Sequence, residues 1–441
     1  MKKLLVAAAA MASSVASAQS YLFSVSYNTV YDTVDGTSLK MDIYQPSGTR
    51  GARPLVIAIH GGCFTGGDKS DMNYIAEALA KQGMVVANVN YRVASQAVYP
   101  AAHQDVRAAL RYMRAKGIAF NIDQNRVAAI GTSAGSTLAA ALGVEPVYNR
   151  AGGQDTSSQR VNIVIVNHGR MDFTHDQYAT DLTRLDCAEH YLGRKRETNP
   201  QEFFNASPIN KVDAASARFI ITHGLSDANV LPLHAQRMHQ RIIEKGGKST
   251  LVMMEGVGHS LPWAAFTLSR ALVKRSFGMP YQINEDATNR KRIDAGSGST
   301  SIVTPGFIAD NYFSGGAVHN YDLLQFPSSI PAAQNVRFSS SGFNYNVPNN
   351  SIGLKKVKLS FFEPYNVAVG YRMQDVRFMG VNAFRNLDVV KIMGSGGKAM
   401  HQEIYISTKS SKISLTFVKK GASKGPAAVG SIEITPLLTV Q

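Results

Sequence analysis

A serine flanked by glycines lies where an apolar stretch ends. In Gly131-Thr132-Ser133-Ala134-Gly135 it follows the apolar run 126–130 and precedes the helix-forming run 137–142. A sharp turn from strand to helix holds a serine hydroxyl clear of its own helix, and flanking glycines remove side chains that would collide there. Serine is a weak nucleophile unless a base, an acid and oxyanion donors assist it. The pattern therefore predicts a nucleophile, provided that these partners occur elsewhere.

Donors for an oxyanion are expected upstream of the serine. The apolar run 54–59 has the composition of a buried parallel strand, and Gly61 and Gly62 follow it. A glycine pair lets backbone N–H groups point inward. We expect the N–H of Gly61 or Gly62, with that of Ala134, to hold the oxyanion of a tetrahedral intermediate, each donor lowering the barrier by about 3 kcal/mol.

An acid and a base follow the serine. Asp227 comes after the strand-like run 219–224, and His259 lies in the loop after the short run 251–254. His259 is expected to take the proton from the serine, while Asp227 fixes the imidazole tautomer and stabilises the imidazolium.

Other histidines and acids receive different interpretations. Asp172, which follows another strand-like run, is the alternative acid. His60 is interpreted as an organiser of the glycine loop. His103, Asp105 and His223 are interpreted as structural.

The segments that position these residues alternate between helix and strand from residue 85 to residue 277. The expected helices are 75–82, 101–116, 233–245 and 263–276, and the expected strands include 84–90. Such alternation favours a mostly parallel sheet with helices on both faces. We expect this catalytic domain over residues 19–280.

The chain order of serine, acid and histidine resembles the alpha/beta-hydrolase superfamily. Within it, residues 40–275 are similar to bacterial esterases of the hormone-sensitive-lipase-like and feruloyl-esterase-like kind. The resemblance implies acyl transfer in two steps, which requires no metal or organic cofactor. Cys63 departs from the pattern, because many relatives carry a third glycine there. The resemblance is carried by His60-Gly61-Gly62, Gly66-Gly67-Asp68-Lys69, Asn90-Tyr91-Arg92, the serine turn, and His223-Gly224 before Asp227.

Two cysteines allow one disulfide. Cys63 lies in the oxyanion loop, and Cys187 lies in the irregular segment 173–205, which we expect to form a small cap. A bridge would attach the cap to the catalytic loop. Two free buried cysteines are the alternative.

The first eighteen residues have the pattern of a secretory signal peptide. Lys2 and Lys3 precede the apolar run 4–12, and Ala16-Ser17-Ala18 suits cleavage. The run is too short for a membrane anchor. We therefore expect a secreted or periplasmic protein that begins near Gln19.

Composition agrees with a large globular chain. The 441 residues are 44% hydrophobic, which is enough for two cores. The formal net charge of +15 divides into +7 on residues 281–441 and +8 before them, so the charge is spread rather than gathered. The sequence has no arginine-rich run with interleaved aromatic residues, the pattern that would predict a nucleic-acid site.

A change in the pattern of apolar and polar residues indicates a second domain. After a polar linker expected at 281–291, the chain from 292 to 441 contains short stretches with alternating apolar and polar residues. Examples are 357–361, 403–407 and 412–417. This period of two, broken by turn residues, predicts an all-β antiparallel sandwich.

The second domain resembles the malectin-like carbohydrate-binding domains, which implies a jelly roll that binds a glycan without cleaving it. Aromatic rings suit this function because the C–H face of a sugar stacks on them. Tyr312, Phe313, Tyr365 and Tyr371 are the candidates, with core packing as the alternative for each. The resemblance is carried by Ile293-Asp294-Ala295-Gly296, residues 309–316, residues 358–364, Gly370-Tyr371-Arg372, Asn386-Leu387-Asp388 and residues 429–434.

Together these features predict an exported serine carboxylic-ester hydrolase that removes acetyl or feruloyl groups from a plant polysaccharide. Its expected partners are the ester and a glycan. A lipase or polyester hydrolase is one alternative, and a peptidase is another. A glycan-binding protein with an inactive hydrolase fold is the alternative from outside the enzymes.

Overall fold

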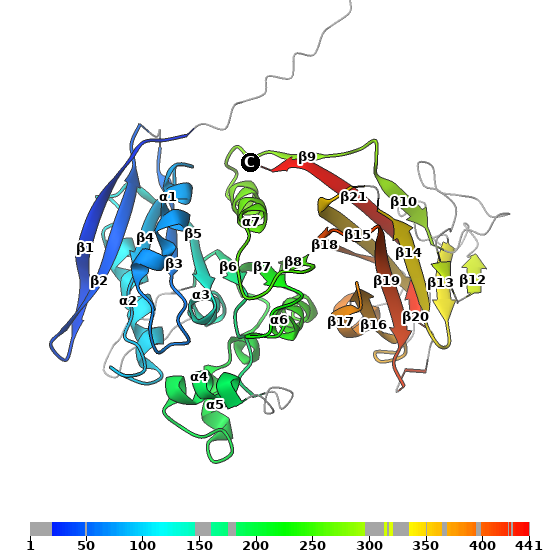
Figure 1. The fold of residues 1–441 in the computed structure, drawn as a ribbon, viewed down its shortest axis with the longest axis horizontal. Coiled ribbons are helices and arrows are strands. Elements are labelled where there is room, and N and C mark those ends of the chain that lie inside the picture. The colour runs from blue at the N-terminus through cyan, green and yellow to red at the C-terminus, as the bar shows by residue number, and fades with distance from the viewer. Residues whose placement is uncertain are drawn as a thin grey trace, which may run out of the picture.

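The computed structural model describes most of the chain (Figure 1). The described residues are 20–48, 51–145, 160–174, 182–295, 313–314, 317–320, 335–349, 351–363, 368–393, 398–421, 423–424 and 427–440. The expected signal peptide lies outside them. Among the described residues, no helix is long and apolar enough to cross a membrane.

The first half of the chain builds a sheet in the order β1-β2-β4-β3-β5-β6-β7-β8. Strands β1 and β2 pair antiparallel at one edge, and the ladders from β4 to β8 are parallel. Because helices cover both faces, β4 and β6 are buried along their whole length, which explains their continuous apolar sequences. The strands are β1 (Phe23–Val34), β2 (Thr37–Pro46), β3 (Arg53–Ile59), β4 (Val85–Val89), β5 (Ile122–Thr132), β6 (Ile163–Asn167), β7 (Arg218–Gly224) and β8 (Ser249–Met254).

The helices divide between the two faces of this sheet. Apolar side chains of α2, α3 and α6 pack in one buried cluster, and those of α1 and α7 pack in another. Helices α4 and α5 form a cap below the sheet in Figure 1, and their apolar side chains join the cluster of α2, α3 and α6. The bounds are α1 (Asn73–Ala80), α2 (Ala101–Ala115), α3 (Ala134–Val144), α4 (Leu182–Leu192), α5 (Pro200–Ala206), α6 (Leu233–Glu244) and α7 (Trp263–Ser276), with short 3-10 turns at Lys69–Met72 and Pro208–Lys211.

The second half forms antiparallel sheets that face one another. Phe361 on β15 and Phe343 on β14 both contact Phe417 on β19, with ring centroids 6.4 and 4.8 Å apart. The strands are β10 (Lys291–Asp294), β11 (Phe313–Ser314), β12 (Ala317–Asn320), β13 (Asn335–Ser339), β14 (Phe343–Pro348), β15 (Gly353–Glu363), β16 (Met373–Phe378), β17 (Val381–Asp388), β18 (Lys398–Thr408), β19 (Lys412–Lys419), β20 (Ala427–Val429) and β21 (Ser431–Val440), and α8 spans Val389–Met393.

The two halves share one sheet. Strand β18 lies parallel to β8, with Ile404 opposite Leu251 and Ile406 opposite Met253. The sheet continues through β15 and β21 to β10, and with β9 (Ile283–Glu285), which pairs with β21, the described residues contribute thirteen strands to it. The edge of the hydrolase sheet is thus covered by the second half of the chain.

The segment expected as a linker, 281–291, is partly structured. Ile283–Glu285 forms β9, which pairs with β21, and the carboxylate of Glu285 pairs with Lys356 on β15. The connection is therefore attached to the second domain over part of its length.

Candidate active site

Ser133 occupies a constrained turn between β5 and α3. Its φ of 49° and ψ of −119° lie outside the regions that non-glycine residues usually adopt. The neighbouring glycines make this turn sterically feasible. A Cβ on Gly131 would lie 2.2 Å from the Gly135 carbonyl oxygen, and a Cβ on Gly135 would lie 2.2 Å from that of Ile59. The fold therefore holds this serine in a strained conformation that its surroundings impose.

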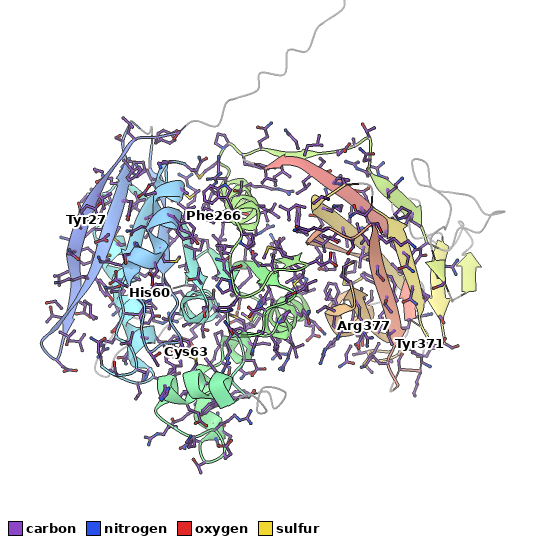
Figure 2. All side chains as sticks on the ribbon, viewed as in Figure 1. Tyr27, His60, Cys63, Phe266, Tyr371 and Arg377 are labelled. Carbon is purple, nitrogen blue, oxygen red and sulfur yellow. A yellow bond between two sulfur atoms is a disulfide. The ribbon has the colours of Figure 1, made fainter. Side chains whose placement is uncertain are left out.

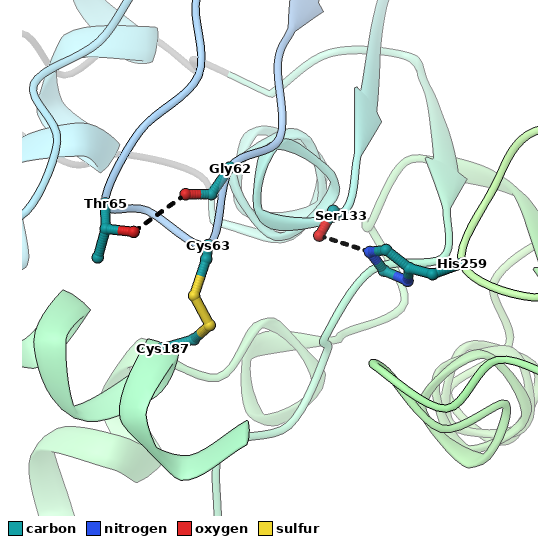
Figure 3. The surroundings of a disulfide bond; sticks show 6 residues. All are labelled: Gly62, Cys63, Thr65, Ser133, Cys187 and His259. Carbon is teal, nitrogen blue, oxygen red and sulfur yellow. Dashed lines mark hydrogen bonds between the residues drawn. A yellow bond between two sulfur atoms is a disulfide. The ribbon is translucent and has the colours of Figure 1, made fainter. Parts of the chain in front are cut away.

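The structure brings Ser133, His259 and Asp227 into one hydrogen-bonded row. The Ser133 hydroxyl lies 2.9 Å from His259 Nε2, as Figure 3 shows, and His259 Nδ1 lies 2.8 Å from Asp227 Oδ2. With its proton on Nδ1, His259 donates to the carboxylate and can accept the serine proton at Nε2. The distances suit a nucleophile, a base and an orienting acid.

Asp227 is held as a carboxylate. Burial acts to raise its pKa, but hydrogen bonds from the side chains of His223 and His259 and from the Val230 N–H outweigh it, and the pKa falls below its usual value. The backbone N–H groups of Asn229 and Val230 both donate to Oδ1 at 2.9 Å. The acid is thus fixed in place and remains charged at neutral pH.

His223 supports this acid, in agreement with the structural role expected for it. Its Nε2 lies 2.7 Å from the Val230 carbonyl oxygen and 3.1 Å from Asp227 Oδ2. The side chain is buried. It therefore helps to fix the loop that carries the acid.

His168 is a residue of the site that the sequence analysis missed. It follows β6, has a φ of 42°, and its ring lies edge-on to that of His259 with centroids 4.4 Å apart. Burial and the positive charge that His259 can acquire lower its pKa to about 3. A signal was available, because β6 ends between the strands that carry the serine and the acid, and residues after adjacent parallel strands meet at one edge.

The predicted oxyanion donors lie beside the serine. A Cβ on Gly61 would approach Ser133 Cβ to 3.2 Å, and Gly62, with a φ of 106°, lines the same cavity as Ala134. A Cβ on Gly62 would lie 2.1 Å from the Gly66 carbonyl oxygen, so only glycine fits.

The loop is braced from behind by His60, as the sequence analysis expected. His60 Nδ1 lies 2.7 Å from the Gly61 carbonyl oxygen, and its ring stacks on Tyr91 with centroids 4.3 Å apart. Tyr91 donates its hydroxyl to the His60 carbonyl oxygen at 3.1 Å. Burial lowers the pKa of His60, which suits a neutral, structural histidine.

A disulfide joins Cys63 to Cys187 with a Cα–Cα distance of 5.2 Å (Figure 3). It connects the oxyanion loop to α4 of the cap. Next to it, Phe64 stacks on Tyr191 of the same helix, with ring centroids 3.9 Å apart. The bridge and the stacked rings give the cap two attachments to the catalytic loop.

The cavity above Ser133 has a volume of about 460 Å³. Both cysteines, Phe64 and Arg170 contribute to its wall, as does His168. The disulfide therefore lines the cavity that contains Ser133, where a third glycine in place of Cys63 would leave more room.

The remaining polar residues have other partners. Asp172 pairs with Arg237 at 2.7 Å and accepts hydrogen bonds from Thr174, so it is engaged away from His259. Asp105 forms a two-bond ion pair with Arg92, at 2.9 and 2.7 Å.

Two of the four glycan-binding candidates lie among the described residues. Tyr312 and Tyr365 lie outside the described residues, and Phe313 begins β11. Tyr371 is half-buried ahead of β16, with the Arg372 guanidinium 5.8 Å from its ring centroid. Figure 2 labels Tyr371 on the second domain, far from Cys63. Their roles remain predictions.

Comparisons with known proteins agree with this architecture. Esterase LipC of Mycobacterium tuberculosis (strain ATCC 25618 / H37Rv) is 31% identical over 216 residues, which cover 47% of this chain and 52% of LipC. The probable carboxylic ester hydrolase LipM of the same organism is 28% identical over 210 residues, covering 46% of this chain and 48% of LipM. The chain thus matches about half the length of these relatives.

A solved structure described as a truncated form of carbohydrate esterase from gut microbiota shares the fold, with a TM-score of 0.51 and 24% identity. The matched region covers 59% of this chain and 98% of the chain in that structure. The BD-FAE family model matches residues 41–242, and the Malectin domain model matches residues 293–431. The chain therefore has an alpha/beta-hydrolase fold in the part that matches the BD-FAE model, followed by an antiparallel part that matches the Malectin domain model.

Proposed function

We propose that this protein is an exported serine carboxylic-ester hydrolase that removes acetyl or feruloyl groups from a plant polysaccharide. The observation that carries the proposal is the row of contacts from Ser133 through His259 to Asp227, at 2.9 and 2.8 Å. The esterase names of the relatives support the reaction class.

The reaction proceeds through an acyl-enzyme. Ser133 Oγ attacks the ester carbonyl carbon as its proton passes to His259 Nε2, and the oxyanion is held by backbone N–H groups at Gly62 and Ala134. The tetrahedral intermediate collapses, and the leaving alcohol takes the proton from His259. Water then attacks the acyl-enzyme, gives a proton to His259, and the serine recovers its proton as the acid leaves.

Two features support a polysaccharide substrate. The second half of the chain matches the Malectin domain model and resembles the malectin-like carbohydrate-binding domains. A structure with the same fold is described as a carbohydrate esterase. A sugar-binding domain in the same chain raises the local concentration of the catalytic domain at a polymer.

Two features support export. The amino-terminal residues have the charge and apolar pattern of a signal peptide. The disulfide between Cys63 and Cys187 is a bond that persists in oxidising compartments.

The test is release of acetate and ferulate from native acylated xylan, beside a chain-length series of p-nitrophenyl esters. Ser133→Ala serves as the blank. Serine-dependent release from xylan is expected. Activity confined to synthetic esters, rising with acyl length, would favour a lipase or polyester hydrolase, and no activity on any ester would favour a glycan-binding protein.

A further inference from the structure

Two of the aromatic rings exposed on the hydrolase domain pack on the same buried side chain. Trp263, at the start of α7, is 58% exposed, and Tyr74, at the start of α1, is 49% exposed. Both contact the ring of Phe266, which is buried, with centroids 5.3 and 6.5 Å from it. Figure 2 labels Phe266 on α7. Trp263 and Tyr74 therefore form an exposed pair on one buried base.

A charged side chain fixes part of this pair. The Arg270 guanidinium, about two turns further along α7 than Trp263, lies 5.9 Å from the ring centroids of both Trp263 and Phe266. Such contacts orient an indole ring and place N–H donors beside its face. The contacts of the Trp263 ring with Arg270 and Phe266 thus fix the orientation of the part that is exposed.

Trp263 lies close in the chain to His259, and Tyr74 lies close in the chain to a residue that contacts the turn carrying Ser133. Trp263 follows His259 by four residues, which limits the distance between their Cα atoms to about 14 Å. Tyr74 follows Met72 by two residues, and Met72 Sδ lies 3.6 Å from Thr132 Oγ1, next to Ser133. The pair therefore lies near the catalytic row, on the side of the sheet that carries α1 and α7.

We propose that Trp263 and Tyr74 form a stacking platform for sugar rings of the polysaccharide whose ester is cleaved. A sugar presents an apolar C–H face that stacks on an aromatic ring and hydroxyl groups that need donors and acceptors. The two exposed rings supply the stacking surface, the Arg270 guanidinium supplies N–H donors, and the Tyr74 hydroxyl can both donate and accept. An alkyl chain would bury the rings but offer no hydrogen-bond acceptor to the guanidinium. A sugar hydroxyl offers one, so the chemistry favours a sugar.

This inference rests on the proposed function for its substrate, but its first test needs no catalysis. Trp263 is the only tryptophan of the chain, so tryptophan fluorescence reports on this position alone. The full chain carrying Ser133→Ala is titrated with unsubstituted xylo-oligosaccharides. A saturable change in tryptophan emission is expected. A flat titration would overturn the platform, and a change produced by lipid vesicles but by no oligosaccharide would assign the rings to an apolar partner instead.

The second test separates polymer from small ester. Trp263→Ala and Tyr74→Ala should each lower kcat/KM on acylated xylan by about tenfold through KM, and leave hydrolysis of p-nitrophenyl acetate unchanged. Trp263→Phe should retain most of the activity on xylan. Tyr27→Ala is the matched control, because Tyr27 is 67% exposed on β1, at the far edge of the sheet in Figure 2.

The outcomes distinguish the two proposals. Unchanged activity on xylan in both alanine variants, or an equal loss on xylan and on p-nitrophenyl acetate, would overturn the platform while leaving the esterase proposal intact. If the unaltered chain hydrolysed no ester, the esterase proposal would be overturned. The fluorescence titration would still show whether Trp263 binds sugar.

Discussion

The hydrolase domain and the Malectin domain place their functional candidates in different ways. In the first, Ser133 follows β5 and His168 follows β6, while Asp227 and His259 lie in the loops after β7 and β8. Parallel order makes the ends of these strands meet, so residues distant in sequence converge. The antiparallel second domain offers no such common edge, and its candidates lie in separate segments. Topology, rather than residue type, therefore made the first site predictable from the sequence.

Ser133→Ala is the largest perturbation of the first region. Without its nucleophile, an enzyme of this mechanism loses up to about a millionfold in kcat. The Malectin domain should be unaffected, because the substitution removes one partly buried hydroxyl. Ester hydrolysis and glycan binding measured on the same preparation check both halves of the comparison. Residual activity above about a thousandth would contradict the assignment.

Asp227→Asn tests which acid orients the base. The amide reverses the hydrogen bond to His259 Nδ1 and should lower kcat by about ten-thousandfold. Asp172→Asn is the matched control. It weakens an ion pair with Arg237 at 2.7 Å and should change kcat by less than tenfold. Steady-state kinetics of the two variants decide, and the opposite ranking would identify Asp172 as the acid.

Removal of the disulfide should loosen the cap. The bridge joins residues 124 positions apart, for which chain entropy predicts a loss of up to about 5 kcal/mol in the free energy of unfolding. Cys63→Ser combined with Cys187→Ser is compared with the unaltered chain by urea denaturation. Adding reductant to the unaltered chain should produce part of the same loss in the free energy of unfolding. An unchanged midpoint in both experiments would mean that Phe64 and Tyr191 alone hold the cap.

Acid should weaken the first region through its buried histidines. The pKa of His168 is about 3, below the value near 6.5 of an unfolded chain. The folded state therefore binds fewer protons, and its stability is full above pH 6.5 and is lost as pH falls toward 3. The loss is on the order of 3 kcal/mol at pH 4. His168→Gln should remove the His168 share of this dependence, measured by urea denaturation at pH 4 and 7, while the buried His239, whose pKa is also lowered to about 3, maintains part of it. The exposed His190→Gln should not reduce it.

Much of the first region was predictable because its signals are local. The apolar period of 263–276 gave the bounds of α7, and that of 101–116 gave those of α2 to within one residue. Buried parallel strands were visible as continuous apolar runs. The triad could be proposed because each member follows such a run.

Other features depend on long-range contacts that no local pattern encodes. The edge-on contact of His168 with His259 depends on the backbone after β6, where φ is positive. The pairing of β18 with β8 joins positions about 150 residues apart, and an alternating strand sequence does not specify its neighbour. The range 281–291 was read as a linker because a three-residue strand such as β9 leaves no periodic signal.

The smallest predicted effect concerns the junction of the two regions. Glu255, just after β8, accepts hydrogen bonds from Thr408 and Ser410 at the end of β18, and the Thr408 hydroxyl is the main cause of its lowered pKa. Glu255→Ala should lower the free energy of unfolding by about 1–2 kcal/mol. Glu77→Ala, which removes an exposed ion pair with Lys81, should cost less than about 0.5 kcal/mol.

Hydrogen exchange shows whether that loss is shared between the two regions. If the continuous sheet makes them one cooperative unit, Glu255→Ala should raise exchange in β8 and β18 together and leave a single unfolding transition. Faster exchange in β18 alone, with a second transition, would mean that the Malectin domain is only attached to the hydrolase edge. In that case the edge of β8 would be stable without its neighbour, and the shared ladder would serve to orient the Malectin domain rather than to complete the fold.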